Sequence, residues 1–109
     1  MIFEQNWEIF NKKLIEFERK YIITPEGYYK NNIYTFQSYI GEMKNNKAEG
    51  KGILDLYPNL ICFGNWKNDR AEGYSCKFIM GIIIEGEHKN GKPNGNCTIS
   101  LGNGDTFEG

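Results

Sequence analysis

The sequence predicts a mainly β protein: a solenoid of stacked antiparallel β-hairpins preceded by one N-terminal amphipathic α-helix. Three observations predict this fold. The first is an aromatic stripe with helical spacing at the start of the chain. The second is a pair of glycine series with a common period in the remainder of the chain, and the third is a set of polar turn signals between the predicted strands. A chain of 109 residues has room for one domain or one short repeat array.

Residues 1–24 are predicted to form the helix. The large apolar side chains recur in steps of three and four residues, which places them on one helical stripe: Phe3, Trp7, Phe10, Leu14, Phe17 and Tyr21. Thr24-Pro25 ends the helix, because the residue before a proline avoids helical geometry. The aromatic stripe either packs on the repeats of its own chain as a cap or docks on a partner, with Trp7 and Phe10 as contacts.

Residues 25–109 are predicted to be a repeat array. One glycine series has spacings of 23, 22 and 23 residues: Gly41, Gly64, Gly86 and Gly109. A second series has spacings of 23, 23 and 22 residues: Gly27, Gly50, Gly73 and Gly95. The shared period predicts a partial repeat at 26–38, full repeats at 39–61, 62–83 and 84–105, and a partial repeat at 106–109.

Each repeat is predicted to be one β-hairpin. Alternate strand residues share a face, so Tyr39, Gly41 and Met43 lie together, as do Cys62, Gly64 and Trp66. The opposite face carries charged and amide residues and is predicted to be solvated. The polar segment 45–50 is predicted to be a hairpin loop, and Asn90-Gly91 and Asn103-Gly104 are further turn signals.

These residues resemble the MORN (membrane occupation and recognition nexus) repeat. Tyr39-x-Gly41-Glu42-Met43-Lys44-Asn45 and Gly50-x-Gly52 are similar to its consensus, and Gly64-Asn65-Trp66-Lys67-Asn68 and Gly86-Glu87-His88-Lys89-Asn90 repeat the same opening. The chain departs from the consensus where aromatic residues are replaced by Met43, Cys62, Ile84 and His88. The resemblance covers about residues 26–109 and marks a divergent array.

The resemblance implies a non-catalytic scaffold or assembly subunit that binds protein, as a helix or an extended peptide, in a cytoskeletal or ciliary assembly. The expected partner contacts on the hairpins are Met43, Tyr57, Trp66 and His88, and core packing is the alternative explanation for each. Two other functions are consistent with the resemblance. One is a peripheral phospholipid-binding module, and the other is a regulatory repeat segment of a larger enzyme.

Composition argues against several other functions. The chain has 13 basic and 14 acidic residues, a balance that disfavours nucleic-acid binding. Three widely spaced cysteines predict a reduced, intracellular protein, and their spacing to His88 predicts no metal site. Gly86 to Lys92 is similar to the start of a phosphate-binding loop, but Pro93 replaces its Ser or Thr. We therefore expect no cofactor, no metal and no catalytic site.

Overall fold

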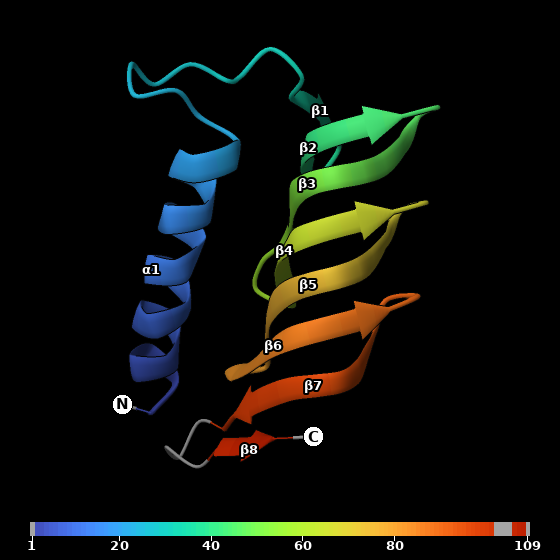
Figure 1. The fold of residues 1–109 in the computed structure, drawn as a ribbon. Coiled ribbons are helices and arrows are strands. Elements are labelled where there is room, and N and C mark those ends of the chain that lie inside the picture. The colour runs from blue at the N-terminus through green and yellow to red at the C-terminus, as the bar shows by residue number, and fades with distance from the viewer. Residues whose placement is uncertain (1, 102–105, 109) are drawn as a thin grey trace.

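One antiparallel sheet and one helix make up the described part of the chain. The computed structural model describes residues 2–101 and 106–108, with side chains for residues 5–101. The eight strands follow chain order within a single sheet, which confirms the mainly β hairpin fold behind an N-terminal helix. The elements (Figure 1) are α1 (Ile2–Tyr21), β1 (Tyr34–Phe36), β2 (Tyr39–Lys44), β3 (Lys47–Leu56), β4 (Leu60–Lys67), β5 (Arg70–Ile79), β6 (Ile82–Lys89), β7 (Lys92–Ser100) and β8 (Thr106–Glu108).

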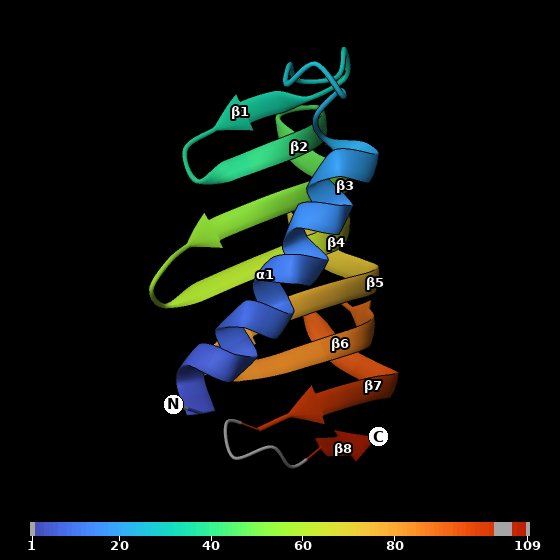
Figure 2. The ribbon, with the colours of Figure 1, turned by 90° about the vertical axis from the view of Figure 1, so that its left-hand side faces the viewer.

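α1 lies obliquely across one face of the sheet, as Figure 2 shows. Its stripe points at the strands, so that Phe10 and Phe17 are buried while Trp7, Leu14 and Tyr21 are partly buried. The side chain of Phe3 lies outside the described residues. Of the two roles considered for this helix, packing on its own chain is the one that the structure shows. α1 covers a face of the sheet rather than closing one end of the array.

The core under α1 consists of aromatic rings from the helix and from the middle strands. Phe10 lies 5.4 Å from Phe63 and 5.3 Å from Phe78, measured between ring centroids. Polar contacts from Asn6 and Lys13 also hold the helix against the sheet. The Asn6 side-chain amide donates to the carbonyl oxygens of Gly81 and Ser100 at 2.7 and 3.2 Å, and Lys13 forms an ion pair with Glu85 at 3.1 Å.

Two-residue turns join the strands within each repeat. Asn45 and Asn46 have φ angles of 54° and 64°, and Asn68 and Asp69 have 51° and 67°. Asn90 and Gly91 follow with 53° and 82°. Two consecutive positive φ angles are the geometry of the type I′ turn, whose twist matches that of the paired strands. Asparagine, aspartate and glycine tolerate this geometry best, so the turn predicted at Asn90-Gly91 is confirmed.

The predicted hairpin loop over 45–50 is wrong. The turn is Asn45-Asn46 alone, and β3 already begins at Lys47. Gly50 instead belongs to a β-bulge, because residues 49–51 of β3 face only Glu42 of β2. The same irregularity follows Gly64 in β4 and Gly86 in β6. The polarity of segment 45–50 therefore reflects an exposed turn plus a bulge rather than one long loop.

The glycines of the second series have distinct roles. Gly50, Gly73 and Gly95 have φ angles of 100°, 85° and 77° within the bulges, a region that side-chain-bearing residues rarely adopt. Gly27 shares their sequence spacing but lies in a turn outside the strands, where its N–H donates to Thr24 O at 2.9 Å. β1 pairs with β2 through Phe36 opposite Tyr39. The segment predicted as a half repeat at 26–38 is thus not spatially equivalent to the bulge halves of the full repeats.

Candidate functional site

The face of the sheet away from α1, here called the open face, has a row of small residues along its middle. The strand register places Gly41 beside Gly52, Gly52 beside Gly64, and Gly64 beside Ser75. The row continues through Gly86 to Cys97. A Cβ on Gly64 would lie 2.6 Å from the Cα of Ser75, so the backbones here are too close for a larger residue.

Two aromatic rings lie over this row. A Cβ on Gly52 would lie 2.5 Å from Cε1 of the Tyr39 ring, which shows that the ring takes the space a side chain would fill. The Tyr39 hydroxyl donates to Glu42 O at 2.8 Å, and the indole N–H of Trp66 donates to Gly52 O at 3.0 Å. The rings meet edge to face with their centroids 5.7 Å apart, a favourable aromatic arrangement.

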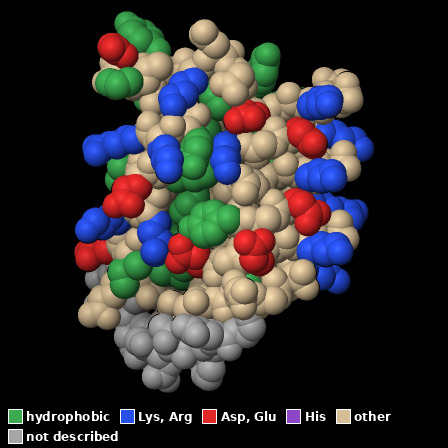
Figure 3. Space-filling view, in the orientation of Figure 1, with side chains coloured by type: hydrophobic (Ala, Val, Ile, Leu, Met, Phe, Trp, Pro, Cys, Tyr) green, Lys and Arg blue, Asp and Glu red, His purple; other side chains and the backbone are tan. Residues whose placement is uncertain are grey.

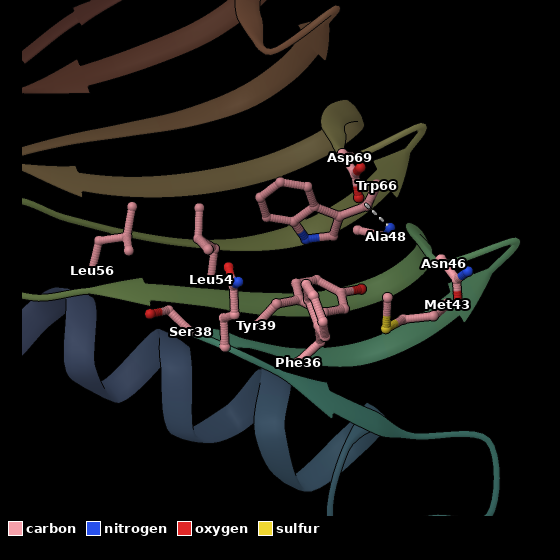
Figure 4. A pocket seen from close by; sticks show the side chains of 11 residues that line it. Phe36, Ser38, Tyr39, Met43, Asn46, Ala48, Leu54, Leu56, Trp66 and Asp69 are labelled. Carbon is pink, nitrogen blue, oxygen red and sulfur yellow. Dashed lines mark hydrogen bonds between the residues drawn. The ribbon is translucent and has the colours of Figure 1, made fainter.

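A pocket of about 380 Å³ opens beside these rings (Figure 4). Its walls come from β1, β2, β3 and β4 and from the turns at both ends of β2 and after β4. The lining residues are Phe36, Gln37, Ser38, Tyr39, Met43, Asn46, Ala48, Leu54, Leu56, Trp66 and Asp69. Phe36 and Leu56 are 58% and 44% exposed and present apolar surface. We call this cavity the open-face pocket.

Two hydrogen bonds between β3 and the turn after β4 hold one wall of the pocket. The Ala48 N–H donates to the Asp69 carboxylate at 2.6 Å, and the Asp69 N–H donates to Ala48 O at 3.1 Å. Burial raises the pKa of Tyr39, and the nearby carboxylates of Glu42 and Asp69 raise it further. The Tyr39 hydroxyl therefore remains a protonated hydrogen-bond donor at neutral pH.

The structure brings two of the predicted contact residues into the pocket. Met43 and Trp66 line the pocket. Tyr57 lies on the helix side, where its ring centroid is 5.7 Å from that of Trp7, and it is 59% exposed. Phe10 is fully buried and His88 is 2% exposed, so neither has side-chain surface for a partner in this conformation. For these two residues, the structure shows core packing, which was the alternative explanation.

Sequence reasoning missed most of the pocket. Phe36, Leu54 and Asp69 come from different elements, and only the strand register brings them together around Trp66. One signal was available: Ala48 and Ala71 occupy the same repeat position, one residue after a cation. A small residue there leaves room for the neighbouring ring. Nothing in the sequence marks Asp69 as more than a turn residue.

The cysteines are buried individually on both faces of the sheet. Burial raises the pKa of the Cys62 thiol to about 11 and also raises that of Cys76. These thiols are protonated at neutral pH and are poor nucleophiles and poor metal ligands in that form. Among the described residues, no group of three His, Cys, Asp or Glu side chains lies close enough to bind one metal ion.

A stack of hairpins with type I′ turns, bulge glycines and aromatic rings over a row of small residues defines a β-hairpin repeat protein. The MORN repeat family model matches residues 39–57, 62–74 and 85–106. The chain is therefore a MORN-repeat protein, and the matched segments begin within one residue of the three predicted full repeats. The comparison with curated proteins found no match. No helix in the described part of the chain is both long and apolar enough to cross a membrane.

Proposed function

We propose that this protein is a non-catalytic scaffold or assembly subunit that holds a segment of another protein on its open face. The observation that carries the proposal is the open-face pocket, a preformed apolar cavity with exposed apolar side chains at its rim. Pockets of this kind receive the anchor side chains that supply most of the binding energy in protein interfaces.

The rim explains why a partner gains by binding. Phe36 and Leu56 keep much of their surface in water, and covering apolar surface is favourable by about 25 cal/mol per Å². The helix face offers little comparable surface in its centre, because α1 already buries Phe63 and Phe78. A partner segment on the open face would bury the side chains of Phe36 and Leu56, just as α1 buries the rings on the other face.

The walls of the pocket are fixed before any partner binds. Trp66, Tyr39 and Asp69 each make a hydrogen bond to backbone, so their side chains keep one orientation. Preorganised contact residues lose little conformational entropy on binding, which favours affinity. The pocket therefore suits a helix or an extended segment that presents one side chain to it.

The resemblance to MORN proteins supports an intracellular setting, with a cytoskeletal or ciliary assembly as the proposed location. Cys62, Cys76 and Cys97 are free and buried, which is compatible with a reducing compartment. Such an assembly role needs a surface for a partner and no reacting group, and the open-face pocket supplies that surface.

Comparison of two aspartate variants in the native cell tests this proposal. Leu56→Asp puts a charge at the pocket rim, and Met80→Asp puts the same charge at an 85% exposed apolar residue in the turn after β5. Cross-linking mass spectrometry would record inter-protein links from Lys44 and Lys47, which flank the first hairpin turn. We expect Leu56→Asp to lose those links and Met80→Asp to keep them, with circular dichroism confirming that both variants fold. Equal links from both variants would contradict the proposal.

The hairpin turns give one observation in favour of the second candidate, a peripheral phospholipid-binding module. Six exposed cations flank the three turns: Lys44, Lys47, Lys67, Arg70, Lys89 and Lys92. Figure 3 shows Lys and Arg side chains along this edge of the molecule, with acidic side chains beside them. Flotation with anionic phosphatidylserine vesicles at moderate salt tests this candidate, and absence of co-flotation would exclude it.

A further inference from the structure

We propose that the open-face pocket takes the side chain of an arginine or a lysine from the bound partner. This inference rests on the proposed function, because it names the chemistry of the residue that the open face selects. It follows from the charge of the pocket wall, the position of the aromatic rings and the state of Asp69.

The pocket lining contains one charged side chain and that charge is negative. Among the eleven described residues that line the pocket, Asp69 is the only one with a carboxylate, ammonium or guanidinium group; the others are apolar or neutral polar residues. Among the residues whose side chains are described, no lysine or arginine forms an ion pair with Asp69. A partner that brings a positive charge would therefore meet a carboxylate that is not already paired with a described lysine or arginine.

Asp69 is held in place with acceptor capacity to spare. One carboxylate oxygen accepts the Ala48 N–H at 2.6 Å, which fixes the side chain against the wall. A carboxylate has two oxygens and about four acceptor positions, so this single bond leaves most of them free for a donor-rich group. A guanidinium or an ammonium group supplies such donors together with the complementary charge.

The aromatic rings favour the same kind of side chain. Figure 4 shows the Asp69 carboxylate beside the indole of Trp66, with Tyr39 across the pocket. A cation near the face of a Trp ring is attracted by the ring electrons, and arginine stacks on aromatic rings more often than lysine does. The methylene stem of either side chain would cover Leu54 and Met43, while its head reaches Asp69.

Other side chains satisfy fewer of these groups. An aspartate or glutamate would meet the Asp69 carboxylate with the same sign of charge. A leucine or phenylalanine would fill the apolar part of the pocket but would cover Asp69 without providing a donor, and covering an unpaired polar group is unfavourable. An arginine or lysine is the class of residue that matches both the apolar walls and the carboxylate.

A pair of probes that differ in charge tests the inference directly. The probes are Nα-acetyl-arginine methylamide and the uncharged isostere Nα-acetyl-citrulline methylamide, titrated at millimolar concentrations into the ¹⁵N-labelled full chain. The reporter is the indole N–H of Trp66, which is hydrogen-bonded to Gly52 O at the pocket wall, assigned with the help of Trp7→Phe. We expect the arginine probe to shift this resonance with an affinity about threefold to tenfold higher than the citrulline probe.

Two matched variants assign the preference to the carboxylate. Asp69→Asn keeps an oxygen that can accept the Ala48 N–H but removes the charge, and it should abolish the difference between the probes. Asp55→Asn removes a charge from an exposed carboxylate that accepts the Tyr57 N–H outside the pocket, and it should preserve the difference.

The inference is overturned if both probes bind equally, if neither shifts the Trp66 resonance, or if Asp69→Asn keeps the preference for arginine. Its failure is distinguishable from failure of the proposed function. Loss of native cross-links in Leu56→Asp together with equal probe binding would keep the scaffold role and remove the basic side chain from it.

Discussion

The two faces of the sheet use aromatic residues in opposite ways. Under α1, the rings of Phe10 and Phe17 each lie 5.0–5.4 Å from the ring of Phe63, and these rings fill the space between helix and sheet. On the open face, Tyr39 and Trp66 lie over a row of glycines and small residues, and a pocket remains beside them. Both faces belong to the same strands, so the difference comes from which residues alternate along them.

This contrast shows how one sheet can use one face for folding and leave the other face available for binding. The helix is a covalently attached partner for the first face, and its contacts contribute to folding. The open face has no such element among the described residues, and its rings are held by hydrogen bonds to backbone instead. Truncation of a ring under α1 should therefore lower stability, whereas a charge placed at the rim of the open-face pocket should lower binding.

The largest effect is expected from the helix face. Phe10→Ala should lower the free energy of unfolding by about 4 kcal/mol, because it leaves a cavity where a fully buried ring contacted Phe63 and Phe78. The control, Ile9→Ala, removes a side chain that is 51% exposed and should cost less than about 1 kcal/mol. Urea denaturation measures both, and equal losses would show that α1 does not pack as described.

The next effect is expected in the small-residue row of the open face. Gly64→Ala should cost about 3 kcal/mol, because its φ of 142° disfavours a side chain and the new Cβ would lie 2.6 Å from the Cα of Ser75. Gly95→Ala is the control, since it also has a positive φ but no atom within 4 Å of the new Cβ, and about 1 kcal/mol is expected. Thermal unfolding of the two variants compares them; a Gly95→Ala loss as large as that of Gly64→Ala would contradict close backbone packing.

A smaller effect is expected at the polar contact that fixes α1. Asn6→Ala removes the donor to Gly81 O and Ser100 O and should lower stability by about 1.5 kcal/mol. Hydrogen exchange should also show faster opening of α1 and of the turn after β5. Unchanged exchange at both places would mean that Asn6 does not link the helix to the sheet.

His88 predicts a modest pH dependence of stability. Burial is the main cause that lowers the pKa of His88, with a smaller lowering from Lys77, whereas the hydrogen bond to Gly86 O and the charge of Glu87 act in the opposite direction. Because the folded protein binds the proton less readily than the unfolded chain, stability should fall as pH drops below about 6.5 and should be unaffected by this group at higher pH.

His88→Phe tests the assignment, since the chain contains one histidine. The midpoint of urea unfolding of the wild type should fall between about pH 7 and pH 5.5, and this part of the decrease should disappear in the variant. Identical pH profiles for both proteins would contradict a neutral, buried His88.

Periodicity predicted the parts of the fold that repeat. The aromatic stripe of α1 and the glycine spacing are local sequence patterns, so the helix and the repeat array could both be predicted from the sequence. The placement of α1 on a face rather than at an end depends on contacts between Phe10 and strands more than fifty residues away. Phe36 reaches the pocket through the pairing of β1 with β2, which does not follow the repeat period. Asp69 reaches it from the turn after β4. Neither residue could therefore be assigned to a pocket from the sequence.

Site-specific photo-cross-linking at two equally accessible positions tests the central claim most directly. Phe36 on the open face is 58% exposed and Ile9 on the outer surface of α1 is 51% exposed, so a benzophenone amino acid at either site is similarly accessible. We predict that the probe at Phe36 captures one recurrent partner segment in the native cell, and that Leu56→Asp abolishes this capture. The probe at Ile9 should give only background. Equal capture of the same segment from Ile9, or capture from Phe36 that persists in Leu56→Asp, would contradict a partner-binding role for the open face.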